Sequence, residues 1–365
     1  METPFKLPFY AKTALIFISV FAFVYVLIIG QDIIVPLAYA TVFAILLNPI
    51  VNFLICKKMN KVIAITIVVL IALIVVLALG YFFFSRISIF SESIPQFKIK
   101  LTRTIDRLVN WYAHEFNYSR SKINQWVSET QNAAISNYNY GETLAQLGKM
   151  SITLALFPVY LFMVLYYKSL LLEFIRKLFR MEHHIAVVEV LTNSKTIIQS
   201  YLVGLFFEMV IMAVLNSAGL LLLGIDYAIM LGVIIAVLNI IPYIGGAIGT
   251  ILPMMVAFIT KDSLGYPVMV LVMHIFIQFF DNNFIVPRIV ASRVQINALI
   301  SIIAVLVGGA IWGVSGMFLS IPLIAILKVI FDHIESLKPW GFLLGNIVPT
   351  NSKFSFIKLK KKSSQ

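Results

Sequence analysis

The stretch NIIPYIGGAIGTILP, residues 239 to 253, places two prolines and three glycines inside an otherwise apolar run. Such residues interrupt helices, and unwound backbone inside a bilayer is costly unless protein or a water-filled cavity surrounds it. The apolar runs on either side, 227–241 and 247–260, would each span only about 22 Å as helices, which is short of a full crossing. The stretch therefore predicts a hairpin of two short helices that enters a membrane and returns.

The composition of the whole chain favours a membrane protein. Of its 365 residues, 61% are hydrophobic and 12% are charged, which is more apolar than a soluble core requires. A bilayer core about 30 Å thick takes about 20 helical residues. Full spans are predicted at residues 13–30, 33–55, 62–85, 150–167, 199–224 and 264–286.

A second interruption resembles the first. Apolar runs at 298–311 and 317–331 flank four glycines, Gly308, Gly309, Gly313 and Gly316, and predict a second hairpin. The predicted fold class is an all-α polytopic membrane protein with about six full transmembrane helices, two opposed broken or re-entrant helical hairpins and an outer amphipathic helical insert. Two full crossings in place of either hairpin would leave the chain ends on the same side, so charge does not separate these topologies.

The distribution of lysine and arginine predicts the orientation. Lys57, Lys58 and Lys61 lie between two predicted spans, and the last thirteen residues carry five more lysines. Because cytoplasmic loops are enriched in basic residues, we expect both chain ends in the cytoplasm. The first hairpin would then enter from outside and the second from inside, so the two would point at each other.

Five segments follow from this topology. They are N-terminal transmembrane helices (1–86), an extracytoplasmic helical insert (87–148), a transmembrane helix with a cytoplasmic amphipathic helix (149–198), a transport core with both hairpins (199–337) and a basic cytoplasmic tail (338–365). Apolar residues every three or four positions predict the two amphipathic parts; the cytoplasmic stripe contains Leu171, Ile175, Leu178, Ile185 and Val188. A helix lying in the headgroup layer fits that composition.

Polar side chains within the spans are candidates for function, because ionisable groups are costly in a bilayer. Glu208 lies about ten residues into its span without a partner there, which makes proton exchange at this carboxyl one hypothesis and a bond to a neighbouring helix the other. His274, Gln278 and Asp281 are spaced by four and three and share a helical face. That stripe is consistent with function or with a structural network that includes Arg288 or Arg293.

Several classes of chemistry lack their motifs. The sequence contains no GxxxxGK[ST] phosphate loop, no HExxH zinc motif and no G-x-S-x-G elbow. A single cysteine, Cys56, excludes a cysteine-based metal cage. The basic residues are scattered between spans rather than gathered in a domain, which disfavours nucleic acid as a partner. We expect a protein that is not an enzyme and that uses no cofactor or metal.

Three stretches resemble the AI-2E family of bacterial membrane transporters. They are NIIPYIGGAIGTILP at 239–253, IQFFDNNFIVPRIV at 277–290 and GGAIWGVSGMFLSIPLIAILKVI at 308–330. The resemblance implies a multi-pass exporter in the bacterial cytoplasmic (inner) membrane that forms homo-oligomers, with a pentamer as the state of relatives. It also implies export of the furanone autoinducer-2, or exchange of sodium or lithium for protons.

These observations predict a secondary transporter of a small polar solute whose site lies at the broken helices. The candidate substrate-binding residues are Asn239, Pro242, Gly245, Gly246, Gly249, Gln278, Asn282, Gly308 and Gly309, and the candidate ion-coupling residues are Glu208 and Asp281. The nearest alternative is a Na⁺(Li⁺)/H⁺ antiporter. An alternative of another class is an oligomeric membrane scaffold that binds proteins through its amphipathic helices. The expected partners are a small molecule or ion, the lipid bilayer and further copies of the chain.

Overall fold

The computed structural model describes residues 8–78, 80–82, 99–100, 102–103, 155–241, 244–291 and 296–346. Within these ranges the chain is helical, apart from its connections and one isolated bridge between Ile296 and Gly345. The helices are α1 (Phe9–Ile29), α2 (Gln31–Cys56), Lys61–Phe82, Ala155–Tyr166, α6 (Lys168–Leu178), α7 (His184–Leu222), α8 (Ala228–Asn239), α9 (Ile244–Thr260), α10 (Gly265–Phe280), α11 (Ala298–His333) and α12 (Lys338–Leu344). Short helical turns lie at η1 (Met181–His183), η2 (Asp281–Ile285), η3 (Pro287–Ala291) and η4 (Glu335–Leu337).

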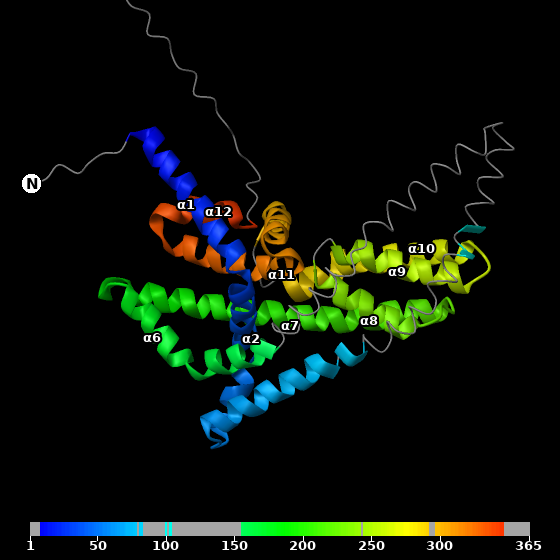
Figure 1. The fold of residues 1–365 in the computed structure, drawn as a ribbon, viewed down its shortest axis with the longest axis horizontal. Helices are drawn as coiled ribbons and strands as arrows, with labels where there is room; N and C mark the ends of the chain where they lie inside the picture. The colour runs from blue at the N-terminus through cyan, green and yellow to red at the C-terminus, as the bar shows by residue number, and fades with distance from the viewer. Residues whose placement is uncertain are drawn as a thin grey trace, which may run out of the picture.

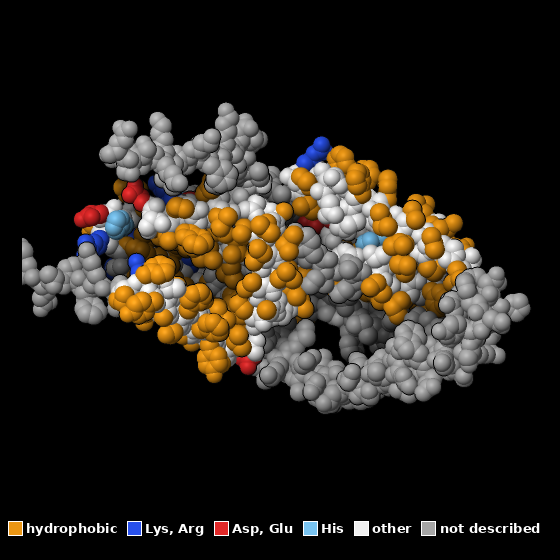
Figure 2. All heavy atoms as spheres, turned by 90° about the horizontal axis from the view of Figure 1, so that it is seen from above, with side chains coloured by type: hydrophobic (Ala, Val, Ile, Leu, Met, Phe, Trp, Pro, Cys, Tyr) orange, Lys and Arg blue, Asp and Glu red, His pale blue; other side chains and the backbone are white. Residues whose placement is uncertain are grey.

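Long apolar helices confirm the predicted all-α polytopic class. Six helices in the described part are long and apolar enough to cross a membrane. Figure 2 shows that hydrophobic side chains cover much of the visible surface, while the Lys, Arg, Asp and Glu side chains in view gather mostly at the left end. Figure 1 places α6 and α12 toward that end. An apolar flank with charges concentrated at an end is what a bilayer requires of a spanning bundle.

Helix α7 organises the bundle. Its 39 residues make a rod of about 58 Å, roughly twice the thickness of the hydrocarbon core. The predicted span 199–224 occupies its second half. In Figure 1 α8, α9 and α10 lie along one half of this rod and α11 and α2 along the other. Residues from α2, α7 and α11, including Val42, Leu202, Leu205, Val305 and Leu319, form one buried cluster between them.

The first predicted hairpin is formed by α8 and α9, which pack against each other, and α8 also packs on α7. The turn between them follows Asn239, so the sequence prediction that Gly245 and Gly246 form the break was wrong in detail, because both lie in the first turn of α9. A Cβ atom on Gly245 would overlap the carbonyl of Leu238. The glycine is therefore needed for the close approach of the two arms. Pro242 lies outside the described residues.

The second predicted hairpin is a single helix by length, since α11 has 36 residues. Its backbone nevertheless leaves the helical region at Trp312 and at Gly313, which has a φ of 59°. A Cβ on Gly308 would meet the backbone of Gly316, and one on Gly316 would overlap the Gly308 carbonyl. Residues eight apart lie about 12 Å apart along a straight helix, so the chain must reverse at Trp312 and Gly313.

The predicted span 150–167 is described from Ala155 only. It bends by 64° into α6 after Tyr166.

The cytoplasmic amphipathic stripe was predicted to form one helix. It is divided between two, because Phe179 and Arg180 are extended between α6 and η1. Residues 87–148, the predicted insert, lie outside the described part except for 99–100 and 102–103. The Lys100 ammonium donates to the carbonyls of Ile259 and Lys261, at the end of α9.

Replacing Gly316 by alanine should destabilise the second hairpin. The new methyl group would meet the Gly308 backbone, which has no rotamer to change, and overpacking of this kind costs about 1–3 kcal/mol. We expect a lower melting temperature of the detergent-solubilised protein. The matched control is Gly80→Ala, because a Cβ there has no heavy atom within 4 Å. Equal melting temperatures for the two variants would contradict the reversal.

Candidate functional site

Two carboxyl groups meet at one amide inside the bundle. The Nδ2 atom of Asn239 donates to Glu208 Oε1 at 3.1 Å and to Asp281 Oδ2 at 2.9 Å. Glu208 is 6% exposed and Asp281 1% exposed. The three residues come from α7, the end of α8 and the start of η2. One neutral side chain thus holds two ionisable groups from two other elements at the tip of the first hairpin.

Gln278 and Asn282 extend this polar cluster toward the surface. The Gln278 Nε2 atom donates to Asp281 Oδ2 at 3.3 Å and lies 3.5 Å from Asn282 Oδ1. Gln278 is half-buried and Asn282 is exposed. Gly246 faces Gln278, since a Cβ atom built on it would lie 3.5 Å from the Gln278 Oε1 atom. The first turn of α9 therefore lies beside the cluster without filling it.

Local backbone geometry places these side chains. Asn239 is the last residue of α8, and Gly245 lets the returning helix close behind its Cα atom. Asp281 begins a π-helical turn, which follows α10 directly and is followed by a second one in η3. Such wide turns occur often at functional sites. The two arms of the site are thus a hairpin tip and an irregular helical segment.

Several buried polar atoms of this region have no hydrogen-bond partner within the described structure. They are Asp281 Oδ1 and Gln278 Oε1 within the cluster, and Asn216 Oδ1 two turns of α7 beyond Glu208. His274 is 2% exposed and precedes Gln278 by one turn of α10. Buried polar atoms are normally bonded to protein or to ordered water. Two acceptor oxygen atoms beside the carboxyl pair, on Asp281 and Gln278, therefore have no donor within the described residues.

In the described part of the chain, no side-chain cation pairs with the cluster; Arg293, one of the two predicted partners, lies outside that part. Arg288, which was predicted to continue the polar stripe, lies with its guanidinium 5.8 Å from the Phe284 ring. Two adjacent carboxylates in a medium of low dielectric repel each other strongly. The arrangement is therefore suited to hold a proton or a cation with the pair.

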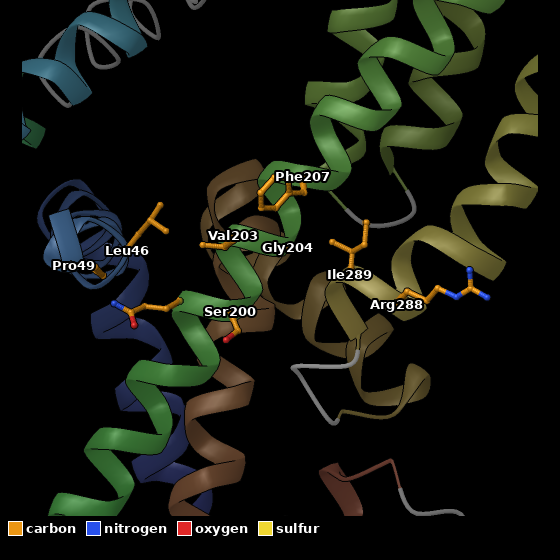
Figure 3. Close-up of a pocket in the computed structure, with 9 residues that line it drawn as sticks. Leu46, Pro49, Ser200, Val203, Gly204, Phe207, Arg288 and Ile289 are labelled. Carbon is orange, nitrogen blue, oxygen red and sulfur yellow. The ribbon is translucent and has the colours of Figure 1, made fainter.

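A cavity of about 450 Å³ lies between α2, α7 and η3. Figure 3 shows Leu46 and Pro49 on one side, the α7 residues in the middle and Ile289 opposite, with the Arg288 side chain extending away from α7. Ser200 and Gly204 line this cavity, and Glu208 follows Gly204 by one turn on the same side of α7. The cavity thus ends one helical turn from the carboxyl pair.

The structure brings together some of the predicted site residues and separates others. Glu208, Asn239, Gln278, Asp281 and Asn282 form one cluster, with Gly246 beside it. Gly249 packs on Ile235, within the hairpin.

Gly308 and Gly309 lie elsewhere, against Gly316 and Met317 of their own hairpin, so their part in substrate binding stays a prediction. The second hairpin packs on α1, α2 and α7, and its Trp312 Nε1 atom donates to the Leu27 carbonyl at 2.9 Å. Ile240 at the tip of the first hairpin and Trp312 at the tip of the second both pack against the buried cluster of α2, α7 and α11.

Sequence reasoning missed the residues that line the cavity. Gln199 and Ser200 begin the membrane half of α7, and Gln199 donates to the Ile45 carbonyl of α2 at 2.6 Å. The sequence does contain a pattern that could have indicated this cavity. Ser200, Gly204 and Glu208 are spaced by four residues, which places two polar groups and a glycine along one side of a helix. This cavity lies beside α2 and η3, and a substrate site at the broken helices stays a prediction.

Several proteins that are similar to this chain in sequence are named as transport proteins. "Putative transport protein YhhT" of Escherichia coli (strain K12) is 26% identical over 316 residues, which cover 87% of this chain and 89% of that protein. "AI-2 transport protein TqsA" of the same strain is 24% identical over 319 residues, covering 87% and 91%. YrrI of Bacillus subtilis (strain 168), described in the same words as YhhT, is 32% identical over 134 residues, covering 36% and 37%.

The model of one protein family, the AI-2E family transporter, matches residues 15–336. This match contains the buried carboxyl pair, both hairpins and every described span. Relatives named as transport proteins align over most of the chain. The chain therefore belongs to the AI-2E family of transporters.

Proposed function

We propose that the protein is a secondary transporter that exports a small polar solute and uses Glu208 and Asp281 as coupling groups. The observation that carries the proposal is the buried amide of Asn239 between these two carboxyl groups. Ionisable groups at such depth are expensive to retain in a membrane protein and characteristically mark ion or substrate pathways. A purely structural contact between three helices could be made by apolar groups at lower cost.

The expected mechanism is a change in what holds the hairpin tip. Asn239 donates one amide group to two acceptors. A proton on either carboxyl group removes a charge from the pair and weakens the corresponding charge-assisted hydrogen bond. A solute with hydroxyl groups could then compete for Asn239, Gln278 and the free oxygen of Asp281. Binding and protonation would in this way be coupled through a single amide.

The class of solute is inferred from the donors and acceptors present. The cluster offers amide and carboxyl groups, and no described lysine or arginine forms an ion pair with it, which favours a neutral polyhydroxylated or cationic solute over an anion. A relative is named an AI-2 transport protein, and we propose an autoinducer-2-like furanone as the first compound to test. We further propose a homo-oligomer in the bacterial cytoplasmic membrane with both chain ends in the cytoplasm, an orientation that the lysine distribution favours.

Removing either buried charge should abolish solute recognition without unfolding the protein. Glu208→Gln and Asp281→Asn keep the shape of each side chain and remove its ability to exchange a proton. We expect the furanone to raise the melting temperature of the natural protein and to have no effect on these variants. The matched control is Asp226→Asn, an exposed carboxylate at the start of the same hairpin, 4.0 Å from the Lys261 ammonium.

Two results would decide against this site. One is undiminished stabilisation by the furanone in both buried variants. The other is equal loss in the Asp226→Asn control, since that result would attribute the effect to general destabilisation. Melting temperatures without solute separate the cases, because neutralising an unbalanced buried carboxylate should leave stability equal or higher.

A Na⁺(Li⁺)/H⁺ antiporter is the second candidate, and the oxygen atoms of the cluster favour it. Asp281 Oδ1 and Gln278 Oε1 are buried acceptors without donors, and Glu208 contributes another carboxylate nearby. Oxygen ligands suit hard cations. The scaffold alternative gains no comparable support, because protein binding through surface helices does not require unpaired oxygens at this depth.

Proteoliposomes separate the antiporter from the solute exporter. If the protein exchanges cations for protons, an inward gradient of NaCl or LiCl should drive protons out of the vesicles. A pH dye trapped in the lumen should then report a rise in pH. The Asp281→Asn variant should give the signal of protein-free vesicles. A proton signal that is independent of Na⁺ and Li⁺, or that persists in Asp281→Asn, would exclude exchange at this site.

A further inference from the structure

Three lysines from three separate segments converge beside α2. The ammonium group of Lys168, the first residue of α6, donates to Asn48 Oδ1 of α2 at 3.0 Å. That of Lys61 donates to the Tyr166 carbonyl at 2.8 Å and lies 5.0 Å from the Tyr166 ring centre. Lys195 lies on α7, one turn before Gln199, which itself reaches α2 at Ile45. We name Lys61, Lys168 and Lys195 the lysine triad.

The triad carries charge that the described protein does not neutralise. The charges of Lys195 and Lys61 both act repulsively on Lys168. No acidic side chain in the described ranges forms an ion pair with any of the three. The nearest acid along α6, Glu173, pairs instead with Arg176 at 2.7 Å and with Lys177 at 3.9 Å. Like charges held together by carbonyl and amide oxygens indicate a site for an anion.

The position of the triad places it at a membrane surface. Lys61 begins the apolar helix Lys61–Phe82, and α2 ends at Cys56. Lys168 follows the bend of 64° between Ala155–Tyr166 and α6. Tyr166 and Tyr167 lie at this bend with their rings 4.9 Å apart, and tyrosines are typical of the interfacial layer. A helix that turns away from its span at such a layer is expected to lie along the headgroups.

Asn48 fixes the geometry of the site. It is 5% exposed, among the described residues with the most deeply buried polar side chains, and its Oδ1 atom holds the Lys168 ammonium in place. The surface next to the triad is apolar, with Ile63, Tyr167 and Leu170 all exposed. Acyl chains could cover these side chains while a phosphate meets the lysines. This neighbouring apolar surface favours a lipid over a free anion.

We propose that the lysine triad binds the phosphate headgroup of an anionic phospholipid. The phosphodiester oxygens would accept from the ammonium groups of Lys61, Lys168 and Lys195, and the acyl chains would lie along the exposed residues of α6 and of the helix that begins at Lys61. Basic pockets between transmembrane helices are known to select such headgroups. The bound lipid would join α2, α6 and α7 at one end of the bundle.

Phosphatidylglycerol titrated into detergent micelles of the full chain tests the proposal. We expect it to raise the melting temperature of the natural protein more than phosphatidylcholine does. Lys195→Gln should weaken the apparent affinity about fivefold, because each basic residue near a lipid surface contributes about 1 kcal/mol. Lys195 is exposed, so this variant is expected to fold normally. Lys168→Gln tests the same site through its half-buried member and should weaken the affinity in the same way.

The matched control is Lys177→Gln, an exposed lysine on α6 that pairs with Glu173 rather than with the triad. It should respond to phosphatidylglycerol as the natural protein does. Equal responses of the Lys195 and Lys177 variants would overturn the proposal, because the lipid effect would then be general attraction to a basic surface. Stabilisation by inorganic phosphate equal to that by phosphatidylglycerol would overturn the assignment to a lipid.

Discussion

Hydrocarbon offers no hydrogen bonds to a peptide group, and this constraint decides where the chain can interrupt its helices. Both interruptions occur where a second helix packs closely enough to replace the solvent. Gly245 meets the backbone of Leu238 in the first hairpin, and Gly308 meets that of Gly316 in the second. The glycines are thus required for contact between the arms rather than for the turns themselves. Among the described glycines of the two interruptions, Gly313 alone has a positive φ and is needed for a turn.

The same close packing brings polar side chains together in the first hairpin. Its tip ends in Asn239, whose amide fits between Glu208 and Asp281. A carboxyl group at this depth would be costly alone, and a pair would be costlier unless a proton or a cation accompanies it. The unpartnered oxygens of Asp281 and Gln278 lie in the same cluster. The fold therefore brings together acceptor oxygens that no donor in the described ranges satisfies.

Much of the architecture could be predicted from the sequence, because spans and isolated polar residues are local signals. Hydropathy located the long helices, and the spacing of His274, Gln278 and Asp281 identified their common face. The meeting of Asn239 with two acids could not be predicted, since it depends on how α8 and α10 both pack on α7. The turns were misplaced because glycine marks both turns and close contacts, and sequence alone does not separate these uses. The cavity was missed because its lining comes from α2, α7 and η3, which are far apart in the chain.

The two hairpins are similar in sequence pattern but differ in what holds their ends. The tip of the second is fastened by Trp312 to the Leu27 carbonyl, and Tyr39 contacts the Ser315 carbonyl behind it at 3.5 Å. Neither bond involves a group that changes charge near neutral pH. The tip of the first is held by hydrogen bonds to two carboxyl groups, whose strength depends on their charge. A proton or cation arriving at the pair would therefore alter the attachment of the first hairpin and leave the second in place. If the proposed coupling at the carboxyl pair holds, α8 and α9 are the part expected to move against α11.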